Sequence, residues 1–188
     1  KAGSLVFSGV EPTPDTLETL SRLGFSEPQS VWSQINNWLG GRARATRTQR
    51  ARELLTMLVP RLVDAMAETG EPDAAFARFA AFYENLPMGV QPLSLLRSEP
   101  ELARELVAIL GLAPRIARTL AQRPVILDVM LDARFSRPLS QDPADELRTR
   151  FLDQMAASEH LEDAMNRARR LAREERFRIG SQILVGRA

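Results

Sequence analysis

Apolar residues recur along most of this chain at spacings of three and four, the period of an amphipathic α-helix. The clearest example is the stretch 93–132. Its first predicted helix follows a serine–glutamate capping box at 98–101, and Gly111 can supply a left-handed end. Pro114 and Pro124 each stand at the first position of a further helix, where the missing N–H is not needed. The stretch therefore predicts three short helices whose apolar faces must be covered by other helices.

The rest of the chain repeats this arrangement of a capping residue or a proline before an apolar run. Six further helices are predicted, with starts at Thr13, Ser26, Thr46, Pro72, Pro143 and Ser158. Pro60 lies inside the third of them, where proline removes a backbone hydrogen bond and should kink or break the helix near 56–59. The helix after Pro72 carries an aromatic stripe, which we interpret as core rather than a ligand site: Phe76, Phe79, Phe82 and Tyr83.

No segment shows the strict alternation of a half-buried strand. The sequence therefore predicts an all-α fold, a multi-helix array or bundle of about eight to ten short helices with a longer C-terminal helix. We expect three parts. Residues 1–12 form an extended lead-in from a preceding domain, and residues 13–141 form a helical connecting domain that ends in a loop at 133–142. Residues 142–188 supply helices that lead into a following catalytic domain absent from this chain.

Composition narrows the class of protein. The chain has 188 residues, of which 44% are hydrophobic and 26% charged, and no apolar run approaches the ~20 residues that span a bilayer. We therefore expect a soluble, cytoplasmic protein with no membrane partner. The absence of cysteine excludes disulfides and thiolate metal sites, and the single histidine, His160, has no second imidazole for a zinc site.

Arginine is the unusual feature of the charge pattern, because Lys1 is the only lysine among 25 basic residues. Five arginines fall in one short run: Arg42, Arg44, Arg47, Arg50 and Arg52. This run is a candidate contact for an anionic partner, either a phosphate, a nucleic acid backbone or an acidic protein. It is equally a helix start with a solvated face, balanced by the acids from Glu53 onward. The net charge of +1 argues against nucleic acid.

Catalytic motifs are missing from the sequence. The Walker pattern, the dinucleotide glycine fingerprint and the nucleophile elbow all need a strand before a helix, and none of them is present. The acidic pairs at 128/132 and 142/145 stand at predicted helix ends, where we interpret them as caps rather than magnesium ligands. His160 is interpreted as an exposed residue of a first helical turn. We therefore predict no catalytic, cofactor-binding or metal-binding residue within this chain.

Four segments taken in order, 5–25, 44–55, 89–111 and 113–132, resemble the central region of the bacterial bifunctional glutamine synthetase adenylyltransferase/deadenylase family. Members of this family carry two nucleotidyltransferase domains, and the present chain is similar to the helical stretch between them. The family's glycine-serine and paired-aspartate metal motif has no counterpart here. Where relatives tend to have an aromatic residue and histidines near the arginine run, this chain has Leu39, Gly40, Gly41 and Ala43.

The resemblance implies a parent enzyme that adenylylates and deadenylylates glutamine synthetase in nitrogen control, using ATP and Mg²⁺. It also implies glutamine synthetase, a PII signal protein and the flanking catalytic domains as partners. We therefore predict that the chain is a non-catalytic helical linker or regulatory region of such an enzyme. The alternative is a free-standing helical protein-interaction or nucleic-acid-binding module that uses the basic segment Arg42–Arg52.

Overall fold

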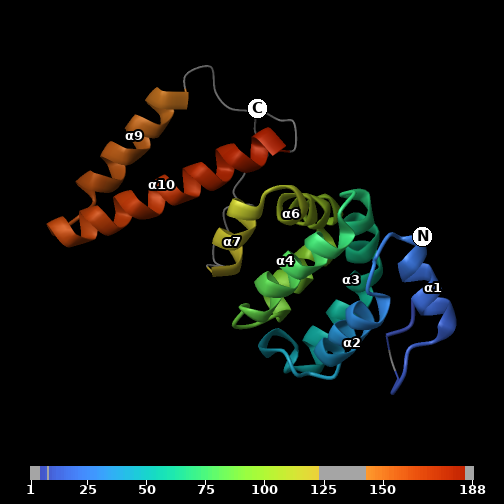
Figure 1. Cartoon of the computed structure of the whole chain (residues 1–188). Coiled ribbons are helices and arrows are strands. Elements are labelled where there is room, and N and C mark those ends of the chain that lie inside the picture. The colour runs from blue at the N-terminus through green and yellow to red at the C-terminus, as the bar shows by residue number, and fades with distance from the viewer. Residues whose placement is uncertain (1–4, 8, 123–142, 185–188) are drawn as a thin grey trace. The chain divides into compact units, whose positions relative to one another are not determined.

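The computed structural model describes residues 5–7, 9–122 and 143–184 of the chain. The helix predicted from Pro124 and the loop predicted at 133–142 lie outside these ranges. The chain divides into two compact units, Lys1–Pro124 and Val125–Ala188. The prediction of an all-α fold is confirmed, because the described ranges contain helices and no strand (Figure 1).

The first unit is an array of helices around α3. Its elements are α1 (Pro14–Arg22), α2 (Pro28–Leu39), the short 3₁₀ helix η2 (Arg44–Thr46), α3 (Gln49–Glu68), α4 (Pro72–Glu84), α5 (Val90–Ser98), α6 (Pro100–Leu112) and α7 (Pro114–Gln122). Helix α3 packs against α2, α4, α5 and α6, so it forms the centre of the array (Figure 1). It runs unbroken through Pro60, so the helix does not break near 56–59, and the kink that was the other expected outcome stays a prediction. The predicted aromatic core is confirmed, because all four rings of the α4 stripe are buried.

The structure confirms one predicted helix cap and moves two others by one or two residues. Thr13 caps α1 as predicted, since its hydroxyl accepts the Thr16 N–H at 3.3 Å. The predicted cap at Thr46 is wrong, because Thr48 caps α3 and accepts the Ala51 N–H at 3.2 Å. The predicted cap at Ser26 is also wrong, since that residue lies two positions before the first helical residue, Pro28.

The capping box predicted at 98–101 fails for the same reason. Pro100 occupies the first helical position of α6, so Glu99 takes the cap position and makes no side-chain cap hydrogen bond. Ser98 instead ends α5, a helix that the sequence pattern did not predict, and its hydroxyl donates to the Leu95 carbonyl at 3.0 Å. A proline fixes the first turn, and the residue two positions before it is too distant to cap.

Gly111 does not end a helix, as its position in the sequence had predicted. It lies inside α6 with a negative φ. A Cβ on Gly111 would stand 2.7 Å from Cγ2 of Thr69, so the glycine allows α6 to approach the end of α3 closely. Arg78 of α4 then donates from NH1 to the carbonyl oxygens of Leu110 and Gly111, at 3.1 and 2.5 Å, and closes the end of α6.

The described part of the second unit is a hairpin of α9 (Pro143–Ala156) and α10 (Leu161–Leu184), which pack against each other. The longer C-terminal helix is confirmed, since α10 has 24 residues. Few apolar side chains are buried in this hairpin. Instead, Glu175 and Arg178 of α10 are 5% and 6% exposed and pair with Arg150 and Glu146 of α9.

Candidate functional site

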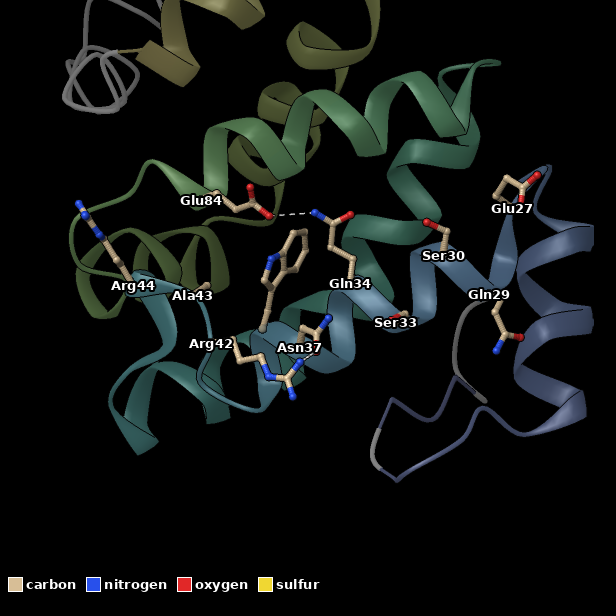
Figure 2. A pocket seen from close by; sticks show the side chains of 11 residues that line it. Glu27, Gln29, Ser30, Ser33, Gln34, Asn37, Arg42, Ala43, Arg44 and Glu84 are labelled. Carbon is tan, nitrogen blue, oxygen red and sulfur yellow. Dashed lines mark hydrogen bonds between the residues drawn. The ribbon is translucent and has the colours of Figure 1, made fainter.

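The best candidate site is an open groove of about 780 Å³ in the first unit, formed by α2, the η2 segment and the end of α4. Figure 2 shows its side chains. The groove is lined by Glu27, Gln29, Ser30, Ser33, Gln34, Asn37, Trp38, Arg42, Ala43, Arg44 and Glu84. Two members of the arginine run therefore share one surface with an uncharged polar helix face. We call this surface the α2 groove.

The two faces of α2 differ in composition. Its inner face buries four apolar residues at helical spacing: Val31, Trp32, Ile35 and Trp38. Its outer face carries amides and hydroxyls but no charged group between Glu27 and Arg42. Gly41 follows with φ +81°, a left-handed conformation that side chains disfavour. The chain thus leaves α2 and turns, and both Arg42 and Arg44 line the same groove.

A packed aromatic cluster supports the groove from beneath. Trp38 is 4% exposed, and its ring centroid lies 4.7 Å from that of Tyr83 and 5.8 Å from that of Phe76. Burial raises the pKa of the Tyr83 phenol well above its ordinary value, an effect that the neighbouring Thr46 hydroxyl partly opposes. The Tyr83 hydroxyl makes no hydrogen bond of normal geometry, although the Thr46 side chain is near enough to influence its pKa. These contacts make the floor of the groove rigid.

Two hydrogen bonds order the polar rim of the groove. The Gln34 amide donates to Glu84 Oε1 at 2.9 Å, which links α2 to α4. Arg42 NH1 donates to Asn37 Oδ1 at 2.7 Å. Both contacts are visible in Figure 2, where Arg44 extends away from the other labelled side chains. The Arg44 side chain makes no hydrogen bond or ion pair within the described ranges.

The remaining predicted arginines do not line the α2 groove. Arg47 is exposed and makes no side-chain contact with a described acid. Arg50 pairs with Glu53 one turn further along α3, at 3.3 Å. Arg52 turns back and donates to the carbonyl oxygens of Thr46 and Arg47, at 3.2 and 3.1 Å. The structure thus brings two of the five candidates together and assigns intramolecular contacts to two others.

The acids and the histidine considered in the sequence add no second site. Asp145 and His160 are exposed, while Asp128, Asp132 and Asp142 lie outside the described ranges. Among the described residues no group of three or more Asp, Glu, His or Cys side chains is placed to hold a metal ion. In the same ranges, no helix combines the length and the apolar character needed to cross a bilayer.

Sequence reasoning missed most of the groove. It treated α2 as a core helix because of its two tryptophans and gave no role to the outer amides, to the serines or to Glu84. One signal was available, since α2 contains no charged residue in a chain that is 26% charged. The contribution of Glu84 carried no such signal, because it lies 50 positions after Gln34.

Comparison with known proteins identifies relatives of the whole chain. A family model described as glutamate-ammonia ligase adenylyltransferase matches residues 103–188. The chain is 45% identical to the bifunctional glutamine synthetase adenylyltransferase/adenylyl-removing enzyme of Caulobacter vibrioides over 99% of its own length, which is 18% of that protein. It is 43% and 40% identical to the proteins of the same description from Agrobacterium fabrum and Rhizobium meliloti, again over 99% of the chain and 19% of each relative.

No solved structure matches this chain. The chain spans about one fifth of the length of the relatives that it matches. The sequence resemblance drawn from the four ordered segments is confirmed over nearly the whole chain. This chain is therefore similar, over nearly its whole length, to one part of the bifunctional glutamine synthetase adenylyltransferase/adenylyl-removing enzymes.

Proposed function

We propose that this chain acts as a non-catalytic, helical connecting and regulatory segment of an enzyme that adds AMP to glutamine synthetase and removes it. The observation that carries the proposal is the 45% identity to a bifunctional enzyme of this kind over 99% of the chain, which is only 18% of that enzyme. An all-helical array without a strand in its described ranges supports a connecting role. The proposed boundaries are a lead-in at 1–12, a connecting domain at 13–141 and exit helices at 142–188.

In this proposal the magnesium–ATP chemistry takes place outside the present chain. Magnesium bound with a nucleotide takes converging carboxylates as ligands. The described ranges place no three such side chains together. In the proposal, the ATP and Mg²⁺ that the resemblance implies bind to other parts of the parent enzyme. In this proposal the groups of the present chain hold surfaces in position and take no part in the transfer step.

The proposed regulation follows from having two opposed activities in one polypeptide. Adding and removing the same group at once would waste ATP, so one activity must be favoured over the other. A helical connector with two packing arrangements can do this if an effector binds one of them more tightly. The proposed partners are glutamine synthetase, a PII signal protein and the two catalytic domains, all in the cytoplasm.

The test replaces the matching segment of the Caulobacter vibrioides relative with this chain. The chimera and the isolated chain are each incubated with glutamine synthetase, Mg²⁺ and labelled ATP. We expect the chimera to transfer label to glutamine synthetase and the isolated chain to transfer none. Label transferred by the isolated chain would show that it is catalytic. A chimera that folds but has neither activity would contradict its role as a connecting segment.

A free-standing interaction module remains the second candidate function. The observation that favours it is the exposure of Arg44 and Arg47, neither of which makes a side-chain contact with a described acid. A salt titration with double-stranded DNA and with an acidic protein tests it. Binding to nucleic acid should fall steeply as salt rises and should be lost when all five arginines become alanine. Absence of binding at low salt would exclude the nucleic-acid form of this function.

A further inference from the structure

We propose that the α2 groove is a docking site for an extended segment of a partner protein, which carries carboxylate side chains at the end that meets Arg42 and Arg44. This inference does not depend on the proposed function, because it rests on the chemistry of the groove. Three features carry it: a helix face without charge, a row of peptide-like side chains and two arginines at one end.

The lack of charge on the outer face of α2 is typical of an interface. Exposed helix faces usually carry Lys, Glu or Asp, and these residues are depleted at the cores of protein interfaces, where Trp and Arg are enriched. Residues 28–41 contain no charged side chain, although Gln29, Ser30 and Ser33 are exposed. Trp38 lies in the groove floor and Arg42 and Arg44 at its end. The lack of Lys, Glu and Asp between Glu27 and Arg42 and the two arginines at the end of the groove are therefore features of an interface, whereas Ser30, Ser33 and Ala43 are of types common on exposed surfaces.

The row of side chains along α2 suits a peptide backbone. One stripe of polar side chains runs along the helix, because these residues are spaced three or four positions apart: Ser30, Ser33 or Gln34, and Asn37. A carboxamide both donates and accepts, as does a peptide group, and the two can pair through two hydrogen bonds. The stripe from 30 to 37 is roughly 10 Å long at ~1.5 Å per residue, about the length of three residues of an extended chain.

The charged residues at the two ends of the groove determine the orientation in which the partner segment docks. At the η2 end, Arg42 is exposed and its side chain donates to the neutral Asn37, and the Arg44 side chain makes no hydrogen bond or ion pair with a described residue. At the start of α2 the charged lining residue is Glu27. Glu84 already accepts the Gln34 amide. Carboxylates of the partner are therefore favoured beside Arg42 and Arg44, and disfavoured beside Glu27.

The rigid floor favours binding by a preformed surface. Trp38 packs on Tyr83 and Phe76, all of which are at most 7% exposed, and Gln34 fixes α2 to α4 through Glu84. A surface that is already ordered loses little conformational entropy when a partner binds. The partner segment loses more, because it becomes extended on binding. The expected affinity for a short peptide is accordingly weak and is best followed by NMR.

The probe is an acetylated and amidated octapeptide with serine, glycine and asparagine at its first five positions and aspartate at the last three. It is titrated at low ionic strength into the full ¹⁵N-labelled chain. We expect shifts confined to the groove, at the side-chain amides of Gln29, Gln34 and Asn37 and at the Trp38 indole. A matched peptide with asparagine in place of aspartate should bind at least about tenfold more weakly.

Two variants of equal charge change provide the control. Arg44→Glu should weaken binding of the aspartate peptide at least about tenfold. Arg118→Glu, at an exposed position of α7 outside the groove, should change its binding by less than about twofold. Ser33→Glu should also weaken binding, because it places an acid in the uncharged stripe. Equal effects of Arg44→Glu and Arg118→Glu, shifts centred elsewhere, or no shift at millimolar peptide would each overturn the proposal.

Discussion

The aromatic core of the first unit and the α9–α10 hairpin are held together by different interactions. Around α3 and α4 the buried residues are nearly all apolar, and Phe79, Phe82 and Tyr83 are at most 2% exposed. In the hairpin, large apolar residues such as Leu152 and Leu161 remain 55% and 79% exposed, while charged groups are buried between the helices. The interior of the first unit is therefore mainly apolar, whereas the interior of the hairpin includes a paired-charge network that loses stability when one member is removed.

The two regions should therefore respond differently to the substitution of a buried residue. An apolar core loses stability in proportion to the surface and volume removed from it. A buried ion network loses stability when one member is removed, because its partner is left charged and unpaired. Both tryptophans of the chain, Trp32 and Trp38, lie in the first unit, so tryptophan fluorescence reports on that unit. Hydrogen exchange resolves the amides of α10.

The largest expected effect is that of Phe79→Ala in the first unit. Phe79 is 2% exposed and contacts Trp38, Phe82 and Tyr83, so its removal leaves a cavity that the stacked rings cannot fill easily. The free energy of unfolding should fall by about 4 to 5 kcal/mol. Urea unfolding followed by tryptophan fluorescence measures it.

The matched control for this change is Phe151→Ala in the hairpin. Phe151 is 41% exposed, so the same substitution removes little buried surface there. Its effect should stay within about 0.5 kcal/mol. A loss of several kcal/mol for Phe151→Ala would show that the apolar surface of the hairpin is covered, and it would remove the contrast between the two regions.

The second largest effect is expected for Glu175→Ala in the hairpin. The Glu175 carboxylate accepts hydrogen bonds from Arg150 and from Arg178, the second at 3.0 Å. The substitution therefore leaves two guanidinium groups without the acid that they share. Because Arg150 is still 19% exposed and reaches water, we expect a loss of roughly 3 to 4 kcal/mol, at the lower end of the range for buried pairs. Hydrogen exchange of amides 171–184 should accelerate accordingly.

Glu162→Ala is the control within the same helix. Glu162 is exposed in the first turn of α10, where an acid gains only from the helix dipole. Its removal should cost no more than about 0.5 kcal/mol. If the two variants exchanged at the same rate, the buried network would not be what stabilises the hairpin.

The sequence predicted the periodic features and missed those that depend on distant neighbours. Helical faces repeat locally, so the apolar side of α6 and the aromatic side of α4 were predicted without tertiary information. The role of Gly111 was not predicted, because the glycine is needed for its close approach to Thr69, more than forty residues away in the sequence. Helix α5 was not predicted, since Pro87, Gly89 and Pro92 surround its start.

The candidate site shows the same limit. Arg42 and Arg44 were predicted as contacts for an anionic partner, but their separation from Arg50 and Arg52 depends on η2 and on Thr48, which begins α3 two residues later than predicted. Once α3 begins there, Arg50 meets Glu53 and Arg52 meets backbone carbonyls. A two-residue shift of a helix start thus decides which basic side chains remain available.

The third effect tests close backbone packing in the first unit. A Cβ at Gly89 would lie 2.1 Å from the carbonyl oxygen of Ala45, and backbone atoms cannot rotate away. Gly89→Ala should cost about 2 to 3 kcal/mol. Gly111→Ala should cost less, because its closest neighbours are Cγ2 and Cβ of the Thr69 side chain, at 2.7 and 3.0 Å, rather than backbone atoms, and alanine favours a helix by about 1 kcal/mol over glycine. Its net effect, measured by the same urea titration, should be below about 1 kcal/mol.

The smallest effect at neutral pH is that of Tyr83→Phe. The buried Tyr83 oxygen has no hydrogen bond within normal geometry, so its removal should change stability at neutral pH by less than about 0.5 kcal/mol. The substitution should change the stability of the chain mainly at high pH. Burial raises the pKa of the folded phenol above its ordinary value of 10.0, so the unfolded chain loses this proton first as the pH rises. The unfolded state then binds fewer protons than the folded state, and stability falls above pH 10 by about 1.4 kcal/mol per pH unit.

Tyr83 is the only tyrosine of the chain, and Lys1 is its only lysine, so this titration is nearly free of other contributions. Urea unfolding at several pH values above 10 should show the fall in the parent chain and its absence in Tyr83→Phe. The near-ultraviolet absorbance of tyrosinate should appear only as the parent chain unfolds. Because the group lies in the aromatic core, hydrogen exchange in α10 should show the same pH dependence in both proteins. An equal loss of stability in the parent chain and in Tyr83→Phe would mean that the phenol beneath the α2 groove is open to water, and the rigid floor assigned to that groove would be wrong.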